Sequence, residues 1–305
     1  MFNFSDEALG LILDYVKDVR NLVIKLGFDI KSEYLEMLMF DIENYLKFFS
    51  IKHARKRKAT IVEAADARHA LKKFGKPEKL VKSHFRGPET CTNAQRITFT
   101  YLSAMKKKIE KTRVPIVLDA GCGWGRFVKK LRSYVPKNFE MVGVDLDHLS
   151  LQYGKTINES VAFSRSEIQG LPFKDEVFDI IMCSGVIHEV KNVKGRNKAL
   201  REFARVIKPN GQLYIIDAFT KYKFVNILTR LLQYIPKLEI EWIFHKGQLE
   251  NLLQENEFKI TSIEKTGSRA LGTITGYTFT AIAHRSTWPR RSSAPTIEIF
   301  SKNQK

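Results

Sequence analysis

The stretch Ile116–Val128, which reads IVLDAGCGWGRFV, decides the fold of this chain. Three glycines, Gly121, Gly123 and Gly125, fall within five positions, directly after an apolar run that ends in Asp119. Glycine permits positive φ angles and a close approach of the backbone to a neighbouring group. The stretch therefore predicts a turn whose backbone lies against a phosphate, a neighbouring strand or a cofactor without phosphate.

The residues on either side of the glycines predict a strand and a helix. Val114–Leu118 is short, apolar and rich in β-branched residues, which is typical of a buried parallel strand. After Gly125 the apolar residues recur at helical spacing, and Pro136 ends the predicted helix. A strand, a glycine turn and a helix form the first unit of a doubly wound sheet, in which ligands bind at the carboxyl ends of the strands.

The glycine spacing differs from two common nucleotide-binding motifs. A dinucleotide-binding turn follows G-x-G-x-x-G, but here the third glycine comes one residue early and Arg126 occupies the expected place. A P-loop ends in Lys-Ser or Lys-Thr, which this turn lacks. The choice of ligand therefore depends on the sequence downstream.

Downstream segments predict four more strands. Met141–Asp145 is a second apolar strand that ends in an acid 20 residues after Gly125. Asp145 suits a carboxylate that accepts hydrogen bonds from ribose hydroxyls, or it caps the next helix, a role that Asp147 can also fill. The third, fourth and fifth strands are expected at 161–165, 177–183 and 213–217, with a turn at Lys208–Gly211 before the last.

In this order the segments resemble the class I S-adenosylmethionine-dependent methyltransferases, in the branch that includes quinone, sterol and other small-molecule methyltransferases. The matching segments are LDAGCGWGRF, VGVDLD, SEIQGLPFKDEVFDIIMCSGVIHEV and LREFARVIKPNGQLYIID, within residues 110–285. The resemblance implies an α/β fold with a doubly wound, seven-stranded Rossmann-like sheet. Its sixth and seventh strands are expected at 258–264 and 275–283. It also implies S-adenosyl-L-methionine as the cofactor, which carries no phosphate.

The resemblance implies where this cofactor binds. Asp119 and the loop at Gly121 would contact the methionine amino group, whose positive charge suits a carboxylate. Asp145 would hold both ribose hydroxyls, and Leu146 would pack on the adenine ring. The other residues of the glycine turn that belong to the implied site are Cys122, Gly123 and Gly125.

The adenine and methionine ends of the implied site lie further along the chain. Glu167 corresponds to the acid that accepts the adenine amino hydrogen, where the family more often has Asp, and it is alternatively an ordinary surface acid. Ile168 would make the neighbouring backbone contact. Cys183 and Ser184 would line the methionine end of the pocket.

Methyl transfer from a sulfonium is an in-line displacement, for which positioning does most of the chemistry and one base suffices. We expect the acceptor beyond the fourth and fifth strand ends, near His188, Glu189 and Asp217. His188 is the candidate base, because the unperturbed pKa of histidine lies near neutrality. The alternative is that His188 only shapes the pocket.

Composition agrees with an enzyme of the cytoplasm. The chain has 305 residues, of which 44% are hydrophobic, enough for one large core and a smaller satellite domain. Its three cysteines are too few and too scattered to predict a disulfide framework or a metal site. No apolar run approaches membrane-spanning length, and the first residues are acidic rather than typical of a secretory signal.

The sequence predicts further segments on both sides of the cofactor-binding domain, which is expected at 114–284. Residues 1–90 predict a small all-helical domain, in which Ser5 caps the first helix and Gly27 ends it, while Thr60 and Glu63 form a capping box. Residues 91–113 predict a linker or helix. Residues 219–245 are rich in large apolar side chains and predict a lid over the acceptor or, equally, core packing, and 285–305 predict a loose tail.

Positive charge is concentrated in the second half of the predicted helical domain and in the segment that follows it. The net charge is +18, and residues 47–113 contain 19 basic and five acidic residues, with the densest run at Lys52–Lys58. Such a segment predicts contact with nucleic acid or an anionic membrane surface, or a solvated basic face.

The sequence after the fourth strand argues against base methylation of DNA. An Asn/Asp-Pro-Pro-aromatic turn is absent there, and Cys183 lacks the preceding proline that is typical of cytosine C5 enzymes. A small-molecule or lipid-like acceptor is therefore the leading prediction. RNA methylation through the basic segment and a non-catalytic cofactor-binding interaction protein remain the alternatives.

Overall fold

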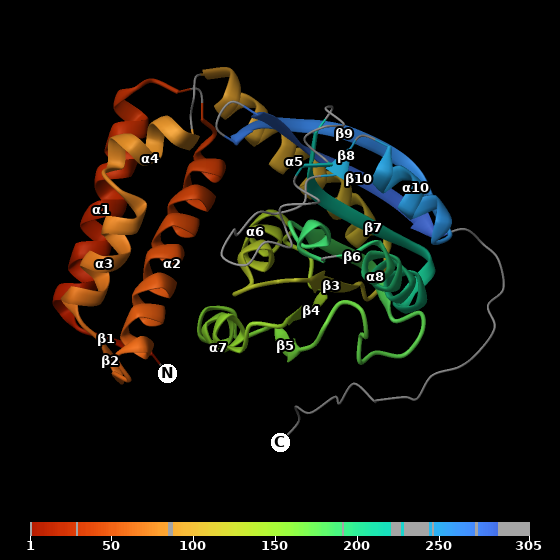
Figure 1. The fold of residues 1–305 in the computed structure, drawn as a ribbon, viewed down its shortest axis with the longest axis horizontal. Coiled ribbons are helices and arrows are strands. Elements are labelled where there is room, and N and C mark those ends of the chain that lie inside the picture. Colours follow the sequence, from red (N-terminus) through yellow and green to blue (C-terminus); the bar gives the residue numbers. More distant parts are fainter. Residues whose placement is uncertain are drawn as a thin grey trace. The chain divides into compact units, whose positions relative to one another are not determined.

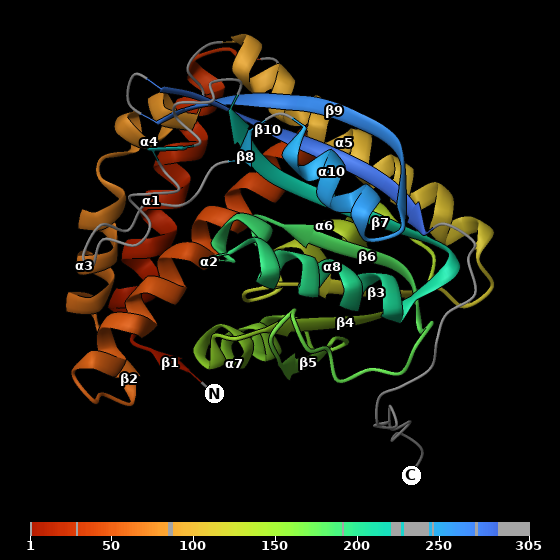
Figure 2. The ribbon, with the colours of Figure 1, turned by 45° about the vertical axis from the view of Figure 1, so that its right-hand side comes forward.

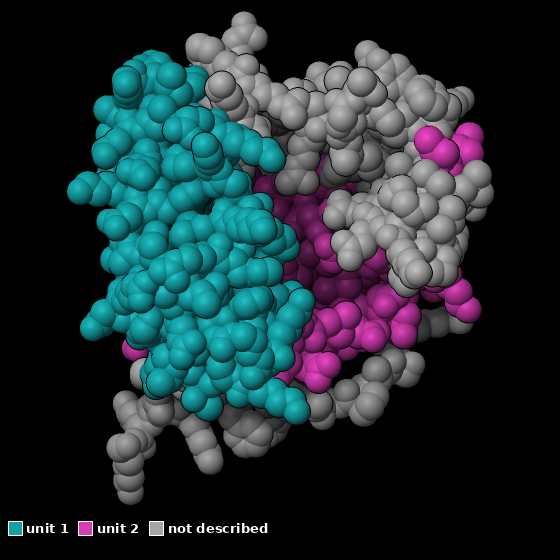
Figure 3. Space-filling view, turned by 60° about the vertical axis from the view of Figure 1, so that its left-hand side comes forward, with its two compact units in different colours: residues 1–100 teal, residues 101–305 magenta. Residues whose placement is uncertain are grey.

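The computed structural model describes residues 2–28, 30–84, 88–190, 192–220, 227–228, 244–245, 247–271 and 274–285. In 82–84, 88–97, 218–220, 244–245, 263–271 and 274–285 it describes the backbone alone. The chain divides into two compact units, unit 1 with residues 1–100 and unit 2 with residues 101–305 (Figure 3). Most of the predicted lid at 219–245 and almost all of the predicted tail lie outside the described residues.

Unit 1 is built mainly of helices around its own apolar core (Figure 1). Helix α1 begins after Ser5, whose Oγ accepts a hydrogen bond from the Ala8 N–H at 3.2 Å. Gly27, with φ +66°, follows its end, so both predicted limits of this helix are confirmed. The helices are α1 Asp6–Lys25, α2 Ser32–Lys56, α3 Ala64–Phe74 and α4 Pro77–His84.

Two predictions for unit 1 are wrong. It is not all-helical, because β1 (Asn3–Phe4) and β2 (Ile61–Val62) pair in parallel. That pairing keeps residues 61–62 extended, so α3 begins at Ala64 rather than Thr60. The predicted capping box shifts by three residues, since the Asp66 carboxylate accepts the Glu63 N–H at 2.9 Å.

Unit 2 contains an eight-stranded sheet (Figure 2). The strand order is β5-β4-β3-β6-β7-β10-β9, and β8 pairs with β7 outside this path. Strands β3 to β7 run parallel, whereas β10 is antiparallel to both β7 and β9. The strands are β3 Ile116–Ala120, β4 Glu140–Asp145, β5 Ala162–Arg165, β6 Phe178–Ser184, β7 Ile207–Thr220, β8 Phe244–His245, β9 Phe258–Leu271 and β10 Ile274–Arg285.

Helices pack on both faces of this sheet, as expected for a doubly wound fold (Figure 2). Side chains of α8 and α10 join those of β3, β4, β6 and β7 in one buried apolar cluster, while α6 lies on the opposite face. The helices are α5 Pro88–Lys111, which crosses the boundary between the units, α6 Arg126–Tyr134, α7 His148–Ile157, the 3₁₀ turn η1 Ile187–Glu189, α8 Val193–Val206 and α10 Gln248–Glu255.

The predicted doubly wound sheet is confirmed, with two corrections: it has eight strands rather than the predicted seven, because β8 pairs with β7, and its first strand starts later than predicted. The first strand starts at Ile116, because Val114 is exposed, and it continues to Ala120, whose backbone pairs with both β4 and β6. The predicted turn at Lys208–Gly211 lies within β7, where the pairing register shifts and the chain bends, so that a Cβ built at Gly211 would lie 3.0 Å from the Lys208 carbonyl oxygen. Ile207 pairs with Phe178, and Gln212 then pairs with Ile180. Among the described residues, no helix combines the length and apolar composition needed to cross a membrane.

The strand order places the candidate site. From β3 the chain proceeds to β4 and β5 on one side and then crosses to β6 on the other. In such sheets the ligand crevice forms where the order reverses, outside the carboxyl ends of the strands. The relevant ends here are those of β3, β4, β6 and β7.

Candidate active site

The glycine turn after β3 is held against the end of β4. The N–H groups of Gly121 and Cys122 both donate to the Val144 carbonyl, at 2.8 and 2.9 Å. The Gly123 N–H donates to Oδ2 of Asp145 at 2.7 Å. The close backbone approach that the glycines predicted is therefore, in the first place, an approach to the neighbouring strand.

Two of these glycines have different surroundings. Gly121 has φ +77°, and a Cβ built there would lie 2.2 Å from Cγ2 of Val186, in the loop before η1. Gly123 has φ +54°, but a Cβ there would meet no described atom within 4 Å. Gly121 thus lets two loops pack together, while Gly123 lies beside open space at the strand ends.

This difference predicts unequal effects of alanine at the two positions. Gly123→Ala is expected to lower the free energy of unfolding by about 1 kcal/mol, the cost of a left-handed non-glycine residue. Gly121→Ala is expected to lower the free energy of unfolding by a further amount of about 1–3 kcal/mol, because the new methyl group overlaps Val186. Adding Val186→Ala should restore part of the lost stability in the double variant. Urea unfolding of the four proteins measures both effects, and equal losses at the two positions would contradict the predicted contact.

Asp119, the next-to-last residue of β3, is a buried carboxylate. The residue is 2% exposed, and its Oδ2 has no hydrogen-bond partner among the described residues. Burial, with the nearby charge of Asp145, raises the pKa of Asp119 to about 7, and Arg126 opposes this shift. A buried acceptor without a partner is costly, and a bound cation would satisfy it. The unpartnered Oδ2 of Asp119 is therefore the feature of this strand end that suits an ammonium group.

Asp145 is half-buried at the end of β4 and organises the turn that follows. Its Oδ1 accepts the Asp147 N–H at 2.9 Å, while Oδ2 holds Gly123. Asp147 is the residue that caps α7, because its Oδ1 accepts the Leu149 N–H at 3.2 Å. Asp145 therefore does not cap α7. The next residue, Leu146, is 56% exposed.

The remaining sequence-predicted residues lie at three places. Glu167 is exposed, and Ile168 is buried in the main core cluster. Cys183, at the end of β6, is fully buried, and Ser184 beside it is half-buried. Burial raises the pKa of the Cys122 and Cys183 thiols, which leaves both as unreactive thiols near neutral pH.

His188 and Asp217 form a buried pair. Nδ1 of His188 lies 2.5 Å from Oδ1 of Asp217, and the His188 N–H donates to Oδ2 at 3.2 Å. Asp217 lies on β7 and is 2% exposed, while His188 lies on η1 and is 7% exposed. With the proton on Nδ1, the carboxylate fixes the ring and leaves the Nε2 lone pair as the proton acceptor.

Arg196 on α8 is a residue of this site that sequence reasoning missed. It is fully buried, and its guanidinium donates from Nε to the Ile187 carbonyl at 3.0 Å and from Nη2 to the His188 carbonyl at 3.2 Å. The sequence did contain a signal for a buried role, because Arg196 lies four residues before Leu200 and therefore on the apolar stripe of α8. A charged residue on a buried stripe is rare unless it has partners.

Within the part of the chain that the structure describes, no group of three or more His, Cys, Asp or Glu residues is arranged to hold a metal ion. The described polar groups of the site are carboxylates, backbone N–H groups, a hydroxyl and an imidazole. They suit hydrogen bonding to a polar organic ligand and transfer of a proton.

Residues 118–215 match the family model described as "Methyltransferase domain". The ubiquinone/menaquinone biosynthesis C-methyltransferase UbiE of Pectobacterium carotovorum is 31% identical over 107 residues, which cover 33% of this chain and 41% of that protein. The tRNA (carboxymethyluridine(34)-5-O)-methyltransferase of Arabidopsis thaliana is 26% identical over 153 residues, 50% of this chain and 36% of that protein.

The chain spans about half the length, or less, of the curated relatives that it matches. A crystal structure from Galdieria sulphuraria aligns with a TM-score of 0.52 and 14% identity, covering 65% of this chain and 87% of that one. At that identity the likeness shows the fold alone, and it agrees with the parallel sheet described above.

Proposed function

Because residues 118–215 form a methyltransferase domain of the class I S-adenosylmethionine-dependent type, we propose that this chain transfers a methyl group to a small-molecule or lipid-like acceptor. The observation that carries the proposal is the pairing of two features at one edge of the sheet. Asp119, the next-to-last residue of β3, has a buried Oδ2 without a hydrogen-bond partner among the described residues, and a buried imidazole–carboxylate pair, His188 and Asp217, lies near the ends of β6 and β7.

The proposed cofactor-binding residues contact different parts of the cofactor. Asp119 accepts hydrogen bonds from the ammonium group, and Asp145 accepts hydrogen bonds from ribose hydroxyls through lone pairs that its backbone donors leave open. Gly121, Cys122, Gly123 and Gly125 shape the turn, Leu146, Glu167 and Ile168 surround the adenine, and Cys183 and Ser184 line the methionine end. When bound, S-adenosylmethionine supplies an electrophilic methyl group on its sulfonium.

His188 is the proposed base, and Asp217 is its positioning residue. His188 takes the proton that the acceptor loses as the new bond to carbon forms, and the imidazolium is stabilised by the carboxylate 2.5 Å from Nδ1. Proton removal at a fixed ring requires no movement of η1, whose carbonyls Arg196 holds. The remaining rate enhancement comes from the positioning of the acceptor against the methyl group.

Two observations support the proposed class of acceptor. The UbiE relative is a C-methyltransferase of ubiquinone and menaquinone biosynthesis, which favours a small-molecule or lipid-like acceptor. The buried Cys183 thiol does not suit cytosine C5 chemistry. RNA is the second candidate acceptor, because another relative is a tRNA methyltransferase and basic residues are dense at 47–113.

One screen distinguishes these acceptors from a protein that binds the cofactor without catalysis. The chain is incubated with isotopically methyl-labelled cofactor and separate pools of metabolites, lipids and RNA. Label in the metabolite or lipid pool is the expected result, and label in RNA would replace the proposed acceptor. Tight cofactor binding without label in any pool would favour the non-catalytic protein.

Asp145→Ala tests the proposed ribose contact. We expect it to weaken S-adenosylmethionine binding by about 1.5–3 kcal/mol, because charge-assisted hydrogen bonds are lost, as measured by isothermal titration calorimetry. Asp147→Ala is the matched control, since it removes the α7 cap at a cost of about 1 kcal/mol in stability without touching the proposed ribose site. Unchanged affinity in Asp145→Ala would exclude this strand end from the cofactor site.

A further inference from the structure

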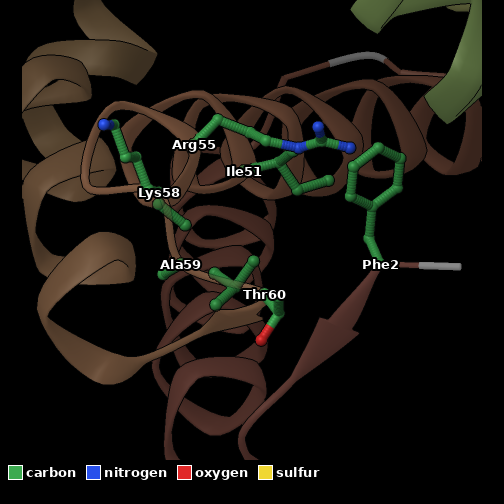
Figure 4. Close-up of a pocket in the computed structure, with 8 residues that line it drawn as sticks. Phe2, Ile51, Arg55, Lys58, Ala59 and Thr60 are labelled. Atoms are coloured by element: carbon green, nitrogen blue, oxygen red, sulfur yellow. The ribbon is translucent and has the colours of Figure 1, made fainter.

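Unit 1 contains a pocket of about 460 Å³ at the end of α2 (Figure 4). Its inner wall is apolar and buried, formed by Ile51, Ala54 and Val62. Arg55 and Lys58 are exposed cations on its rim. Phe2, Ala59 and Thr60 complete the lining. A concave apolar site with a few polar groups at its mouth is the usual form of a small-molecule site.

The basic run Lys52–Lys58 is not one uniform surface. His53 and Arg57 turn to the fully buried Asp66, with His53 Nδ1 2.6 Å from Oδ1 and Arg57 Nη2 2.5 Å from Oδ2. Although burial favours the neutral acid, these hydrogen bonds hold the pKa of Asp66 below its usual value. Two residues of the run, His53 and Arg57, are thereby engaged by Asp66 within the fold.

Arg55 and Lys58 are placed differently. The Arg55 guanidinium lies 5.3 Å from the ring centroid of Phe2, and Figure 4 shows the two side chains meeting on one side of the pocket. Lys58 extends on the other side, on a four-carbon stem that rotates freely. Neither cation forms an ion pair with a carboxylate among the described residues.

Lys58 also occupies a backbone position that favours glycine. Its φ is +57°, its N–H donates to the Arg55 carbonyl at 3.0 Å, and the Ala59 N–H donates to the Ala54 carbonyl at 3.0 Å. This is the Schellman ending of a helix, in which the left-handed residue is usually glycine. Lysine here costs stability, so replacement by glycine separates the role of its charge from that of the fold.

We propose that this pocket binds a phosphate monoester that carries an apolar or planar group. The Arg55 fork matches phosphate oxygens in a bidentate manner. Lys58, which extends on the other side of the pocket, must turn its stem inward to supply a second positive charge for a group that approaches two negative charges at neutral pH. The apolar body of the ligand lies on Ile51, Ala54 and Val62. The site is formed by residues of unit 1 alone and shares no residue with the proposed methyl-transfer site.

The test is a titration of the full chain with phenyl phosphate, followed by amide chemical shifts in NMR. We expect the amides of Lys58, Ala59 and Thr60 to shift, and phenyl phosphate to bind at least about tenfold more tightly than inorganic phosphate or phenol, because each lacks half of the interaction. A 5′-phosphorylated oligonucleotide compared with its 5′-hydroxyl form shows whether the monoester comes from a free metabolite or a nucleic-acid end.

Matched variants make the result specific to the pocket. Arg55→Gln and Lys58→Gly should each weaken binding of phenyl phosphate about tenfold or more, while Lys58→Gly raises the unfolding temperature. Lys56→Gln removes an exposed charge of the same run that does not line the pocket, and should leave affinity within about twofold.

Several outcomes would overturn the proposal. One is the absence of shifts at Lys58–Thr60 at every concentration of phenyl phosphate. Another is an equal loss of affinity in Lys56→Gln and Arg55→Gln. If phenyl phosphate does not bind but single-stranded RNA or anionic vesicles do, equally in all variants, the basic run is a general electrostatic surface.

Discussion

His188→Asn is expected to lower the turnover for the identified acceptor by about 10²–10⁴-fold, the usual contribution of a positioned general base. Asparagine keeps a polar group of similar size beside Asp217 but cannot accept a proton near neutral pH. Turnover is measured with saturating cofactor and acceptor, so that the change reports on the chemical step rather than on binding.

Two further measurements separate a base from a residue that only shapes the pocket. Cofactor affinity should stay within about twofold in His188→Asn, because the variant leaves Asp119 and Asp145 in place. Asp217→Asn should lower turnover less than His188→Asn and change its pH profile, because the ring then loses its charged partner. Near-normal turnover in His188→Asn would show that positioning alone supports the reaction.

Asp119→Asn is expected to remove one contribution to the pH dependence of stability. The folded state holds the pKa of Asp119 at about 7, above its ordinary value of 3.8, so the folded state binds this proton more tightly than the unfolded chain. The stability that this proton contributes is fully present below pH 4 and is lost as the pH rises to 7. Because one pKa unit is worth about 1.4 kcal/mol, the loss is about 4 kcal/mol.

Urea unfolding of the ligand-free protein at pH 5 and pH 8 measures this term. The wild type should lose about 3 kcal/mol more than Asp119→Asn between these pH values, since other titrating groups are common to both proteins. S-adenosylmethionine should bind the wild type more tightly at pH 8 than at pH 6, because the carboxyl must be ionised to pair with an ammonium group. An identical pH dependence in both proteins would contradict the raised pKa of Asp119.

The parts of the site that could be predicted from sequence lie at strand ends. Asp119, Asp145 and Cys183 follow or end short apolar runs, so parallel pairing determines their place once the strands are identified. The central strands β3, β4 and β6 were predictable for the same reason, because they are mostly buried apolar runs separated from their neighbours in the sequence by glycine turns or helical patterns. The class of fold depends on this periodicity rather than on any single residue.

The contacts between segments distant in sequence could not be predicted. His188 and Asp217 were expected near the same acceptor, but their 2.5 Å pairing depends on how η1 folds against β7. The start of α3 was misplaced because Ile61–Val62 pairs with residues at the beginning of the chain. The pocket of unit 1 depends on the left-handed turn at Lys58, and lysine at such a position gives no signal in the sequence.

The buried Arg196 has a consequence for how this site operates over time. Its guanidinium binds the carbonyls of Ile187 and His188 and so connects η1 to α8. The segment that carries His188 is therefore anchored to a helix of the domain and is not a loop that opens and closes over the site. Slow opening and closing of such a segment sets the pace of many enzymes. In the proposed reaction the imidazole is therefore in place before an acceptor binds, and variants of α8 that remove these hydrogen bonds are expected to add a slow rearrangement of η1 to the reaction.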